Sequence, residues 1–208
     1  MEQMNSIVYV VDDDEGVRAA LENLLESAGF EVQVFSSTSN FRAHERAETP
    51  SCLILDVRLK GESGLAFQEW ALENRITIPI IFMTGYGDVE MSVQAMKGGA
   101  VNFLAKPFRE QDMLEAVTEA LTIDEARLKT RRLSEALRKM FSTLTPRERD
   151  IARLVAAGHI NRVTAEKLGL TEMTVKIYRG RVMKKLSARS KAELVKKVRA
   201  LCPDEESQ

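Results

Sequence analysis

Short apolar runs alternate with amphipathic stretches along the chain up to about residue 120. The runs are rich in β-branched residues and bounded by polar or turn residues, as buried strands are. They span Ile7–Val11, Val32–Phe35, Cys52–Leu55, Ile78–Met83 and Val101–Leu104. The stretches between them repeat at helical spacing, and Gly29 suits the position just after the first helix. Five strand–helix repeats predict a doubly wound, five-stranded parallel sheet with helices on both faces.

The pattern changes after about residue 121. Residues 123–143 are charged, have helical spacing and contain no Gly or Pro. Their apolar stripe is short and irregular for a heptad repeat, and a coiled-coil seam is the alternative interpretation. We therefore expect a solvated linker helix there. Four short helical segments follow, at about 146–157, 161–168, 172–186 and 190–201. The chain is thus predicted to hold an α/β domain over 1–122, the linker, an all-α four-helix domain over 144–202 and a disordered tail over 203–208.

Composition argues against several classes of protein. No apolar run approaches the ~20 residues that a membrane helix needs. No basic segment precedes the first apolar stretch, as it would in a signal peptide. The two cysteines, Cys52 and Cys202, make no disulfide framework. We expect a cytoplasmic protein with no membrane partner.

The net charge of −1 conceals a strong asymmetry between the two halves. Residues 1–124 carry 9 Lys and Arg against 21 Asp and Glu, which leaves −12. Residues 125–208 carry 21 against 10, which leaves +11. Such asymmetry indicates two domains and an anionic partner for the second one, although a solvated basic surface would show the same balance.

Polar side chains that could act together stand at the ends of four predicted strands. They are Asp12, Asp13, Asp14, Asp56, Thr84 and Lys106. Ligands of an open parallel sheet bind outside the carboxyl ends of its strands, so the fold would gather these side chains at one edge. Converging carboxylates call for a hard cation such as Mg²⁺. Asp56 would then act as a nucleophile and form an aspartyl-phosphate, with the metal and Lys106 neutralising the phosphoryl charge. Asp14 has a second interpretation, as a helix cap.

The segments VVDDD, LILDVRLKGESGL and IIFMTGYGDVEMSVQAMKGGAVNFLAKPF resemble a response-regulator receiver domain of the FixJ type over about residues 5–122. The resemblance implies the strand order 2-1-3-4-5 and Mg²⁺ or Mn²⁺ bound by Asp13, Asp56 and the Arg58 backbone carbonyl, with Asp12 assisting through water. It implies that Asp56 takes phosphate from a sensor histidine kinase and that Lys106 and Thr84 contact the phosphoryl group. Thr84 and Phe103 would form the switch that leads to a homodimer.

This chain departs from the receiver pattern at two positions, and a third bears on dephosphorylation. Lys60 stands where receivers have Pro, four residues after the phosphoacceptor, which puts the rigidity of that loop in question. The switch aromatic is Phe103, which has no hydroxyl, so packing alone would report its movement. Tyr86, two residues after Thr84, lies where receivers tune dephosphorylation.

The basic half contains the spacing of a helix-turn-helix unit. Ala165 would let two helices approach, Gly169 would take the tight turn, and Val175 would anchor the second helix on the core. Thr171 is suited to cap that second helix. Val182 and Leu186 share the face of Val175 and should be buried. A solvated basic helix face is the alternative interpretation of the remaining positions.

The whole stretch from LTPRERD to AELV resembles the LuxR-type four-helix DNA-binding domain over about residues 144–200. That resemblance implies base or phosphate contacts from the second helix, an effect on RNA polymerase and activation of transcription. The candidate DNA contacts are Thr174, Lys176, Ile177, Arg179, Gly180, Arg181, Lys184 and Lys185. Thr164 departs from the apolar residue that the family has there and would cost stability unless its hydroxyl bonds a carbonyl.

Three other functions compete with a regulator. Asp-based phosphohydrolases also use an aspartyl nucleophile, but they carry a second Asp where this chain has Arg58. A flavin-binding domain of the same topology is disfavoured because three Asp at the first strand end would repel its phosphate. A module whose basic half binds protein remains open, and the salt dependence of duplex binding would distinguish it. We therefore expect a regulator and not an enzyme.

Overall fold

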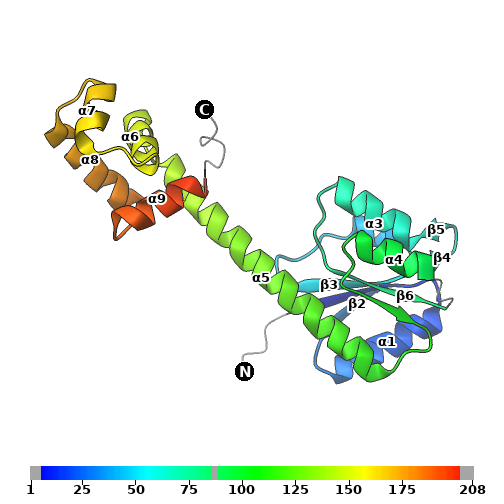
Figure 1. Cartoon of the computed structure of the whole chain (residues 1–208). Helices are drawn as coiled ribbons and strands as arrows, with labels where there is room; N and C mark the ends of the chain where they lie inside the picture. The colour runs from blue at the N-terminus through cyan, green and yellow to red at the C-terminus, as the bar shows by residue number, and fades with distance from the viewer. Residues whose placement is uncertain (1–5, 86–88, 202–208) are drawn as a thin grey trace. The chain divides into compact units, whose positions relative to one another are not determined.

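The computed structural model describes residues 6–85 and 89–201, and it forms two compact units that divide between Lys129 and Thr130 (Figure 1). Tyr86, Cys202 and the tail 203–208 lie outside the described residues. Among the helices that are described, none has the length and apolar character that crossing a membrane would require.

The first unit is built on a parallel sheet in the order β2-β1-β3-β6-β7, which confirms the predicted fold. Its strands are β1 (Ile7–Val11), β2 (Glu31–Phe35), β3 (Ser51–Asp56), β6 (Ile80–Thr84) and β7 (Asn102–Ala105). The fourth strand begins at Ile80 rather than Ile78, because Pro79 has no N–H to donate to the neighbouring strand. Its carbonyl still accepts from Leu53, at 2.9 Å.

Helices cover both faces of this sheet, as expected (Figure 1). Helix α1 (Glu15–Ser27) and the first half of α5 (Glu110–Ser142) pack on one face through a cluster that includes Leu25 and Met113. Helices α2 (Thr38–Ala43), α3 (Gly64–Glu73) and α4 (Val89–Lys97) cover the other face. All strand ends that carry candidate residues therefore remain at one uncovered edge.

A two-stranded hairpin that the sequence pattern did not reveal follows the third strand. Strands β4 (Arg58–Leu59) and β5 (Glu62–Ser63) pair antiparallel, and Lys60 and Gly61 form the tip between them. Two-residue strands are too short to show an alternating pattern, so hydrophobic periodicity could not predict them. The hairpin stands directly beside Asp56, at the end of β3.

Helix α5 (Glu110–Ser142) is continuous from the first unit into the second. Residues beyond 122 still pack on the first unit, because the buried Asp124 carboxylate accepts a hydrogen bond from the Ser51 N–H at 2.9 Å and forms a salt bridge with Arg127 at 2.7 Å. Leu128 is the last buried residue in the part of α5 that packs on the first unit, and Leu133 is exposed. The expected start of the linker at residue 123 thus lies inside one uninterrupted helix.

The second unit contains the four predicted short helices: α6 (Pro146–Ala156), α7 (Asn161–Leu168), α8 (Glu172–Lys185) and α9 (Lys191–Arg199). Their apolar faces meet in one core that includes Ile151, Val182 and Leu194. Gly169 ends α7 in the left-handed region at φ 64°, a conformation that a residue with a Cβ adopts only at a cost. This turn sets the angle between α7 and α8.

Candidate acidic site and nucleic-acid interface

Lys106 joins two carboxylates that lie far from it in the sequence. Its Nζ lies 2.7 Å from Asp12 Oδ2 and 3.0 Å from Asp56 Oδ2. The backbone N–H of Lys106 also donates to the Thr84 carbonyl at 2.7 Å, so the ends of β6 and β7 are held side by side. The residues predicted at four strand ends therefore do meet at one edge.

Backbone groups orient the two carboxylates. The Arg58 N–H donates to Asp56 Oδ1 at 3.1 Å, and the Asp14 N–H donates to Asp12 Oδ1 at 2.9 Å. Gly64 passes so close to Asp56 that a Cβ there would lie 2.4 Å from the Asp56 carbonyl oxygen. Only glycine therefore fits at position 64, where the chain leaves the hairpin.

Burial and the Lys106 ammonium have opposite effects on the pKa of Asp56. Burial raises the pKa of Asp56 above its ordinary value, although the Arg58 N–H and the Lys106 ammonium both act to lower it. For Lys106, burial acts to lower the pKa, but the hydrogen bonds to Asp12 and Asp56 outweigh it and raise the pKa. The lysine therefore stays protonated at neutral pH and supplies a fixed positive charge.

The donor set suits a hard divalent cation. Carboxylate oxygens of Asp12, Asp13 and Asp56 all lie within 4.8 Å of one another. Carboxylate oxygens are the ligands that Mg²⁺ prefers in proteins, and these three residues could hold such an ion.

Asp14, the third member of the acidic run, has a structural role. Its Oδ1 accepts hydrogen bonds from the Gly16 and Val17 N–H groups, at 2.8 and 3.1 Å, and caps α1. These two bonds lower the pKa of Asp14. The helix-cap interpretation is confirmed.

Thr84 and Phe103 lie on the same face of the sheet. Thr84 pairs with Ala105 and Phe82 with Phe103 in the register of β6 and β7, and side chains two residues apart share a face. Thr84 is fully buried, whereas Phe103 is half-buried, with its ring centroid 6.5 Å from that of Phe82. A movement of Thr84 would therefore reach Phe103 through direct neighbours.

In the second unit, α8 divides into a buried and an exposed face. Val175, Val182 and Leu186 are fully buried, as predicted, and Thr171 caps the helix by accepting from the Thr174 N–H at 3.2 Å. The exposed residues include Lys176, Ile177, Gly180, Arg181 and Lys184. Apart from the helix's own backbone and the neighbouring residues, no atom of the described residues lies within 4 Å of the position that a Gly180 Cβ would take, so the backbone there is open to an approaching partner.

Two of the basic residues nominated for DNA already bond the protein. Lys185 Nζ lies 2.6 Å from the buried Glu148 carboxylate and 3.1 Å from the Thr143 carbonyl. Arg179 donates to the Asn161 side chain at 3.0 Å. These contacts join α8 to α6 and α7. Helical spacing had placed Lys185 among the outward-facing positions, and the family resemblance had nominated Arg179.

Thr164 sits in the core as its sequence position suggested. It is fully buried, and its hydroxyl has no hydrogen-bond partner within the described part of the chain. An unsatisfied buried hydroxyl costs about 1–3 kcal/mol. The condition under which the sequence predicts a loss of stability, a buried hydroxyl without a bonded carbonyl, is therefore met.

Comparison with known protein families agrees with both units. The family described as "Response regulator receiver domain" matches residues 8–118, and "Bacterial regulatory proteins, luxR family" matches residues 142–198. The chain belongs to the response regulators that join a receiver domain to a LuxR-family DNA-binding domain. This response regulator is therefore homologous to transcriptional regulators along most of its length.

Two relatives illustrate the extent of the match. Nodulation protein W of Bradyrhizobium diazoefficiens is 50% identical over 191 residues, which cover 92% of this response regulator and 84% of the relative. Transcriptional regulatory protein FixJ of the same species is 34% identical over 189 residues, which cover 91% and 92%. Both relatives match across the receiver and the DNA-binding unit.

Two solved structures also match the response regulator over most of its chain. The response regulator StyR has a TM-score of 0.83 at 45% identity, with 93% of this chain and 98% of that chain covered. Full-length FixJ from B. japonicum has a TM-score of 0.56 at 32% identity, with 95% and 98% covered. The receiver fold and the helical second unit agree with these structures.

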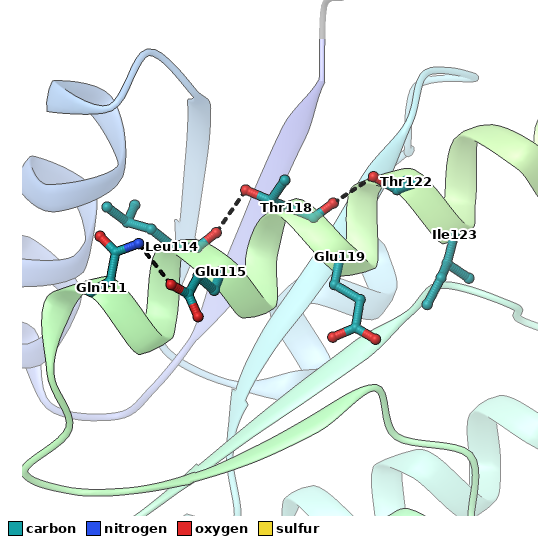
Figure 2. A pocket seen from close by; sticks show the side chains of 7 residues that line it. All are labelled: Gln111, Leu114, Glu115, Thr118, Glu119, Thr122 and Ile123. Atoms are coloured by element: carbon teal, nitrogen blue, oxygen red, sulfur yellow. Dashed lines mark hydrogen bonds between the residues drawn. The ribbon is translucent and has the colours of Figure 1, made fainter.

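A surface groove on α5 is lined by residues that are not part of the acidic site (Figure 2). It encloses about 510 Å³ and includes Leu114 and Ile123. The hydroxyls of Thr118 and Thr122 donate to carbonyls one turn back, at 2.7 and 2.8 Å, so the helix itself already uses them. No residue of this groove belongs to the acidic site of the response regulator, and we assign it no part in the chemistry.

Proposed function

We propose that Asp56 is the residue that accepts the phosphoryl group, and that its modification controls binding of the second unit to DNA. The observation that carries the proposal is the contact of one ammonium, on Lys106, with both Asp12 and Asp56. That contact gathers a nucleophile, a metal-ligand set and a positive charge at one edge of the sheet. We propose a phosphoacceptor domain over 1–122, a linker over 123–143 whose first turns pack on that domain, and a DNA-binding domain over 144–202.

In the proposed reaction, an Asp56 oxygen attacks the phosphorus of a phosphohistidine on a sensor kinase. The phosphorus–nitrogen bond breaks, and its electron pair returns to the imidazole. Asp12, Asp13, Asp56 and the Arg58 carbonyl would hold Mg²⁺ or Mn²⁺, which stabilises the charge on the phosphoryl oxygens. Lys106 stabilises the same charge, and the Thr84 hydroxyl donates to a phosphoryl oxygen.

A groove beside the site supports a protein as the phosphoryl donor. It encloses about 300 Å³ and is lined by Val17 and Leu24 of α1 together with Lys106, Pro107 and Phe108. Apolar surface next to Lys106 would let a donor protein bury its own apolar side chains while its histidine reaches Asp56. A sensor kinase is the donor that we propose.

An exposed apolar stripe supports dimerisation of the receiver. Val89, Val93 and Met96 repeat at helical spacing on α4, and all three are exposed. Helix α4 packs beside β7, which carries Phe103. We propose that movement of Thr84 and Phe103 rearranges this face and that two copies then bury the stripe together.

The exposed face of α8 supports DNA as the partner of the dimer. Lys176 can pair with a guanine edge or a phosphate, the Ile177 side chain can contact a thymine methyl group, and Gly180 allows close approach. Thr174, Arg181 and Lys184 complete the proposed contacting set, with Arg179 and Lys185 acting through the packing described above. The DNA-bound dimer would then act on RNA polymerase as an activator.

Phosphorylation by a small phosphodonor with Mg²⁺ tests the proposal. The wild type should gain one phosphoryl group by mass spectrometry, elute as a dimer and bind random duplex pools more tightly. Asp56→Asn should do none of these. Asp14→Asn is the matched control, because Asp14 caps α1, and it should be labelled like the wild type. Equal labelling of Asp56→Asn and the wild type would contradict the assignment.

A further inference from the structure

The tip of the β4–β5 hairpin places a second ammonium beside the acidic site. Lys60 Nζ lies 3.4 Å from Asp13 Oδ2. The lysine side chain is 86% exposed, and Asp13 is 21% exposed. Lys106 bonds Asp12 and Asp56, so each of the three carboxylates in the proposed metal-ligand set has an ammonium partner.

The hairpin that carries Lys60 is tied to a neighbouring helix. Glu62, two residues after Lys60, accepts hydrogen bonds from the Thr38 N–H at 3.0 Å, from the Thr38 hydroxyl and from the Ser39 hydroxyl at 2.7 Å. These bonds lower the pKa of Glu62, which therefore stays ionised at neutral pH. Leu59, which pairs with Glu62 across the hairpin, is buried. These contacts limit the movement of the tip.

A cation that binds Asp13 must meet the Lys60 ammonium. The Asp13 oxygen lies 3.4 Å from the Lys60 nitrogen. A divalent ion that approaches this oxygen is therefore repelled by the positive charge of the lysine. Because Lys60 is largely exposed, water and salt screen this repulsion, and the lysine can swing away. The effect on binding is therefore moderate and depends on ionic strength.

We propose that Lys60 is a built-in counter-ion that competes with the divalent cation at Asp13, and that the Glu62 contacts hold it there. The inference rests on the proposed function, in which Asp12, Asp13 and Asp56 bind the metal. It assigns a consequence to the lysine that replaces the usual proline. The receiver would need a higher Mg²⁺ concentration to become competent for phosphorylation.

Calorimetric titration of the full chain with MgCl₂ tests the role of Lys60. Lys60→Gln should bind Mg²⁺ about 2–5-fold more tightly than the wild type at low salt, the range that an exposed ion pair can supply. The gain should shrink at high salt. Lys60→Arg keeps the charge and should match the wild type. Equal dissociation constants for Lys60→Gln and the wild type at low salt would overturn the proposal.

Removing the hydroxyl bonds to Glu62 without changing any charge tests whether those bonds hold Lys60 beside Asp13. The double variant Thr38→Val with Ser39→Ala loses both hydroxyl bonds to Glu62 and should gain part of the same affinity. In the Lys60→Gln background, the double variant should add nothing, because no ammonium remains to be released. An equal gain in both backgrounds would show that the hydroxyls act without Lys60 and would overturn this part.

Asp13→Asn separates the inference from the proposed function. If the wild type binds Mg²⁺ and Asp13→Asn binds far more weakly, the metal site stands and the Lys60 variants decide the inference. If Asp13→Asn binds Mg²⁺ as the wild type does, the proposed metal site is wrong and the role of Lys60 is overturned with it.

Discussion

The charged residues of the receiver and of the DNA-binding unit are arranged in opposite ways. At the receiver edge, the functional candidates contact one another, as Lys106 contacts Asp12 and Asp56. On α8, Lys176 is exposed and has no hydrogen bond or ion pair within the described chain, whereas Lys185 contacts Glu148. Contact with an opposite charge thus marks the proposed chemical site in one unit and joins neighbouring helices in the other.

The difference follows from the partners of the two units. A phosphoryl group and a metal are small, so the receiver must gather several side chains within a few ångströms before they arrive. A duplex is large and carries its own charges, so α8 can leave its contacting side chains in solvent until it binds. Net charge alone could not separate these two uses of lysine.

The largest expected effect compares two lysines of α8. Lys176→Ala should weaken binding of the phosphorylated protein to its DNA by about 1–3 kcal/mol, since it removes a direct contact, and should leave unfolding unchanged. Lys185→Gln should lower the stability of the second unit and change affinity little at a temperature where it is folded. Fluorescence anisotropy and urea unfolding measure the two quantities. Equal loss of affinity in both variants would break the comparison.

The next effect concerns Glu148, which bonds Lys185 and the Thr145 N–H at 2.6 and 2.8 Å. Glu148→Gln should lower the free energy of unfolding of the second unit by about 1.5–3 kcal/mol near pH 7, because it removes charge-assisted hydrogen bonds. Urea unfolding followed by circular dichroism measures it. The fluorescence of Trp70, the only tryptophan, reports the receiver as an internal control.

The same variant predicts a pH dependence. The hydrogen bond from Lys185 holds the pKa of folded Glu148 below its ordinary value. Its contribution to stability is therefore complete above the unfolded pKa of about 4.3 and is lost as pH falls through the folded pKa. The difference between wild type and Glu148→Gln should shrink below about pH 4.3. A difference that stays constant down to pH 3 would contradict this assignment.

The smallest expected effect comes from replacing Thr by Val at two positions, one in the core and one at a helix cap. Thr164→Val should stabilise the second unit by about 1 kcal/mol, because it removes a buried hydroxyl that has no partner in the described chain. Thr171→Val should destabilise it by about 1 kcal/mol, because it removes the cap of α8. Thermal unfolding compares the two variants. The same sign for both would refute the account of Thr164.

Much of the fold could be predicted because its signals are local. Apolar runs marked all five sheet strands within two residues, and the error at Ile78 arose from Pro79, whose missing N–H is itself a local property. The Gly169 turn and the Thr171 cap were equally local. The site residues Asp56 and Lys106 were predicted because parallel strands end at one edge, so position in the strand implies proximity.

Other parts of the site could not be predicted. Strands β4 and β5 are too short for periodicity, so the approach of Lys60 to Asp13 had no sequence signal beyond the missing proline. Lys185 lies at a position on α8 that periodicity places outward, yet α6 brings Glu148 to it. Spacing within one helix carries no information on which neighbouring helix covers it.

The sequence by itself determined the five strands of the parallel sheet, the helices, the turn between α7 and α8 and the family, because each depends on neighbours along the chain. Tertiary structure alone decided which charges neutralise one another. Lys106 and Asp12 are 94 positions apart, and Lys185 and Glu148 are 37 apart. Coulomb energy falls with distance in space and not with separation in sequence, so only the folded chain shows which lysines bond the protein and which remain open to a partner.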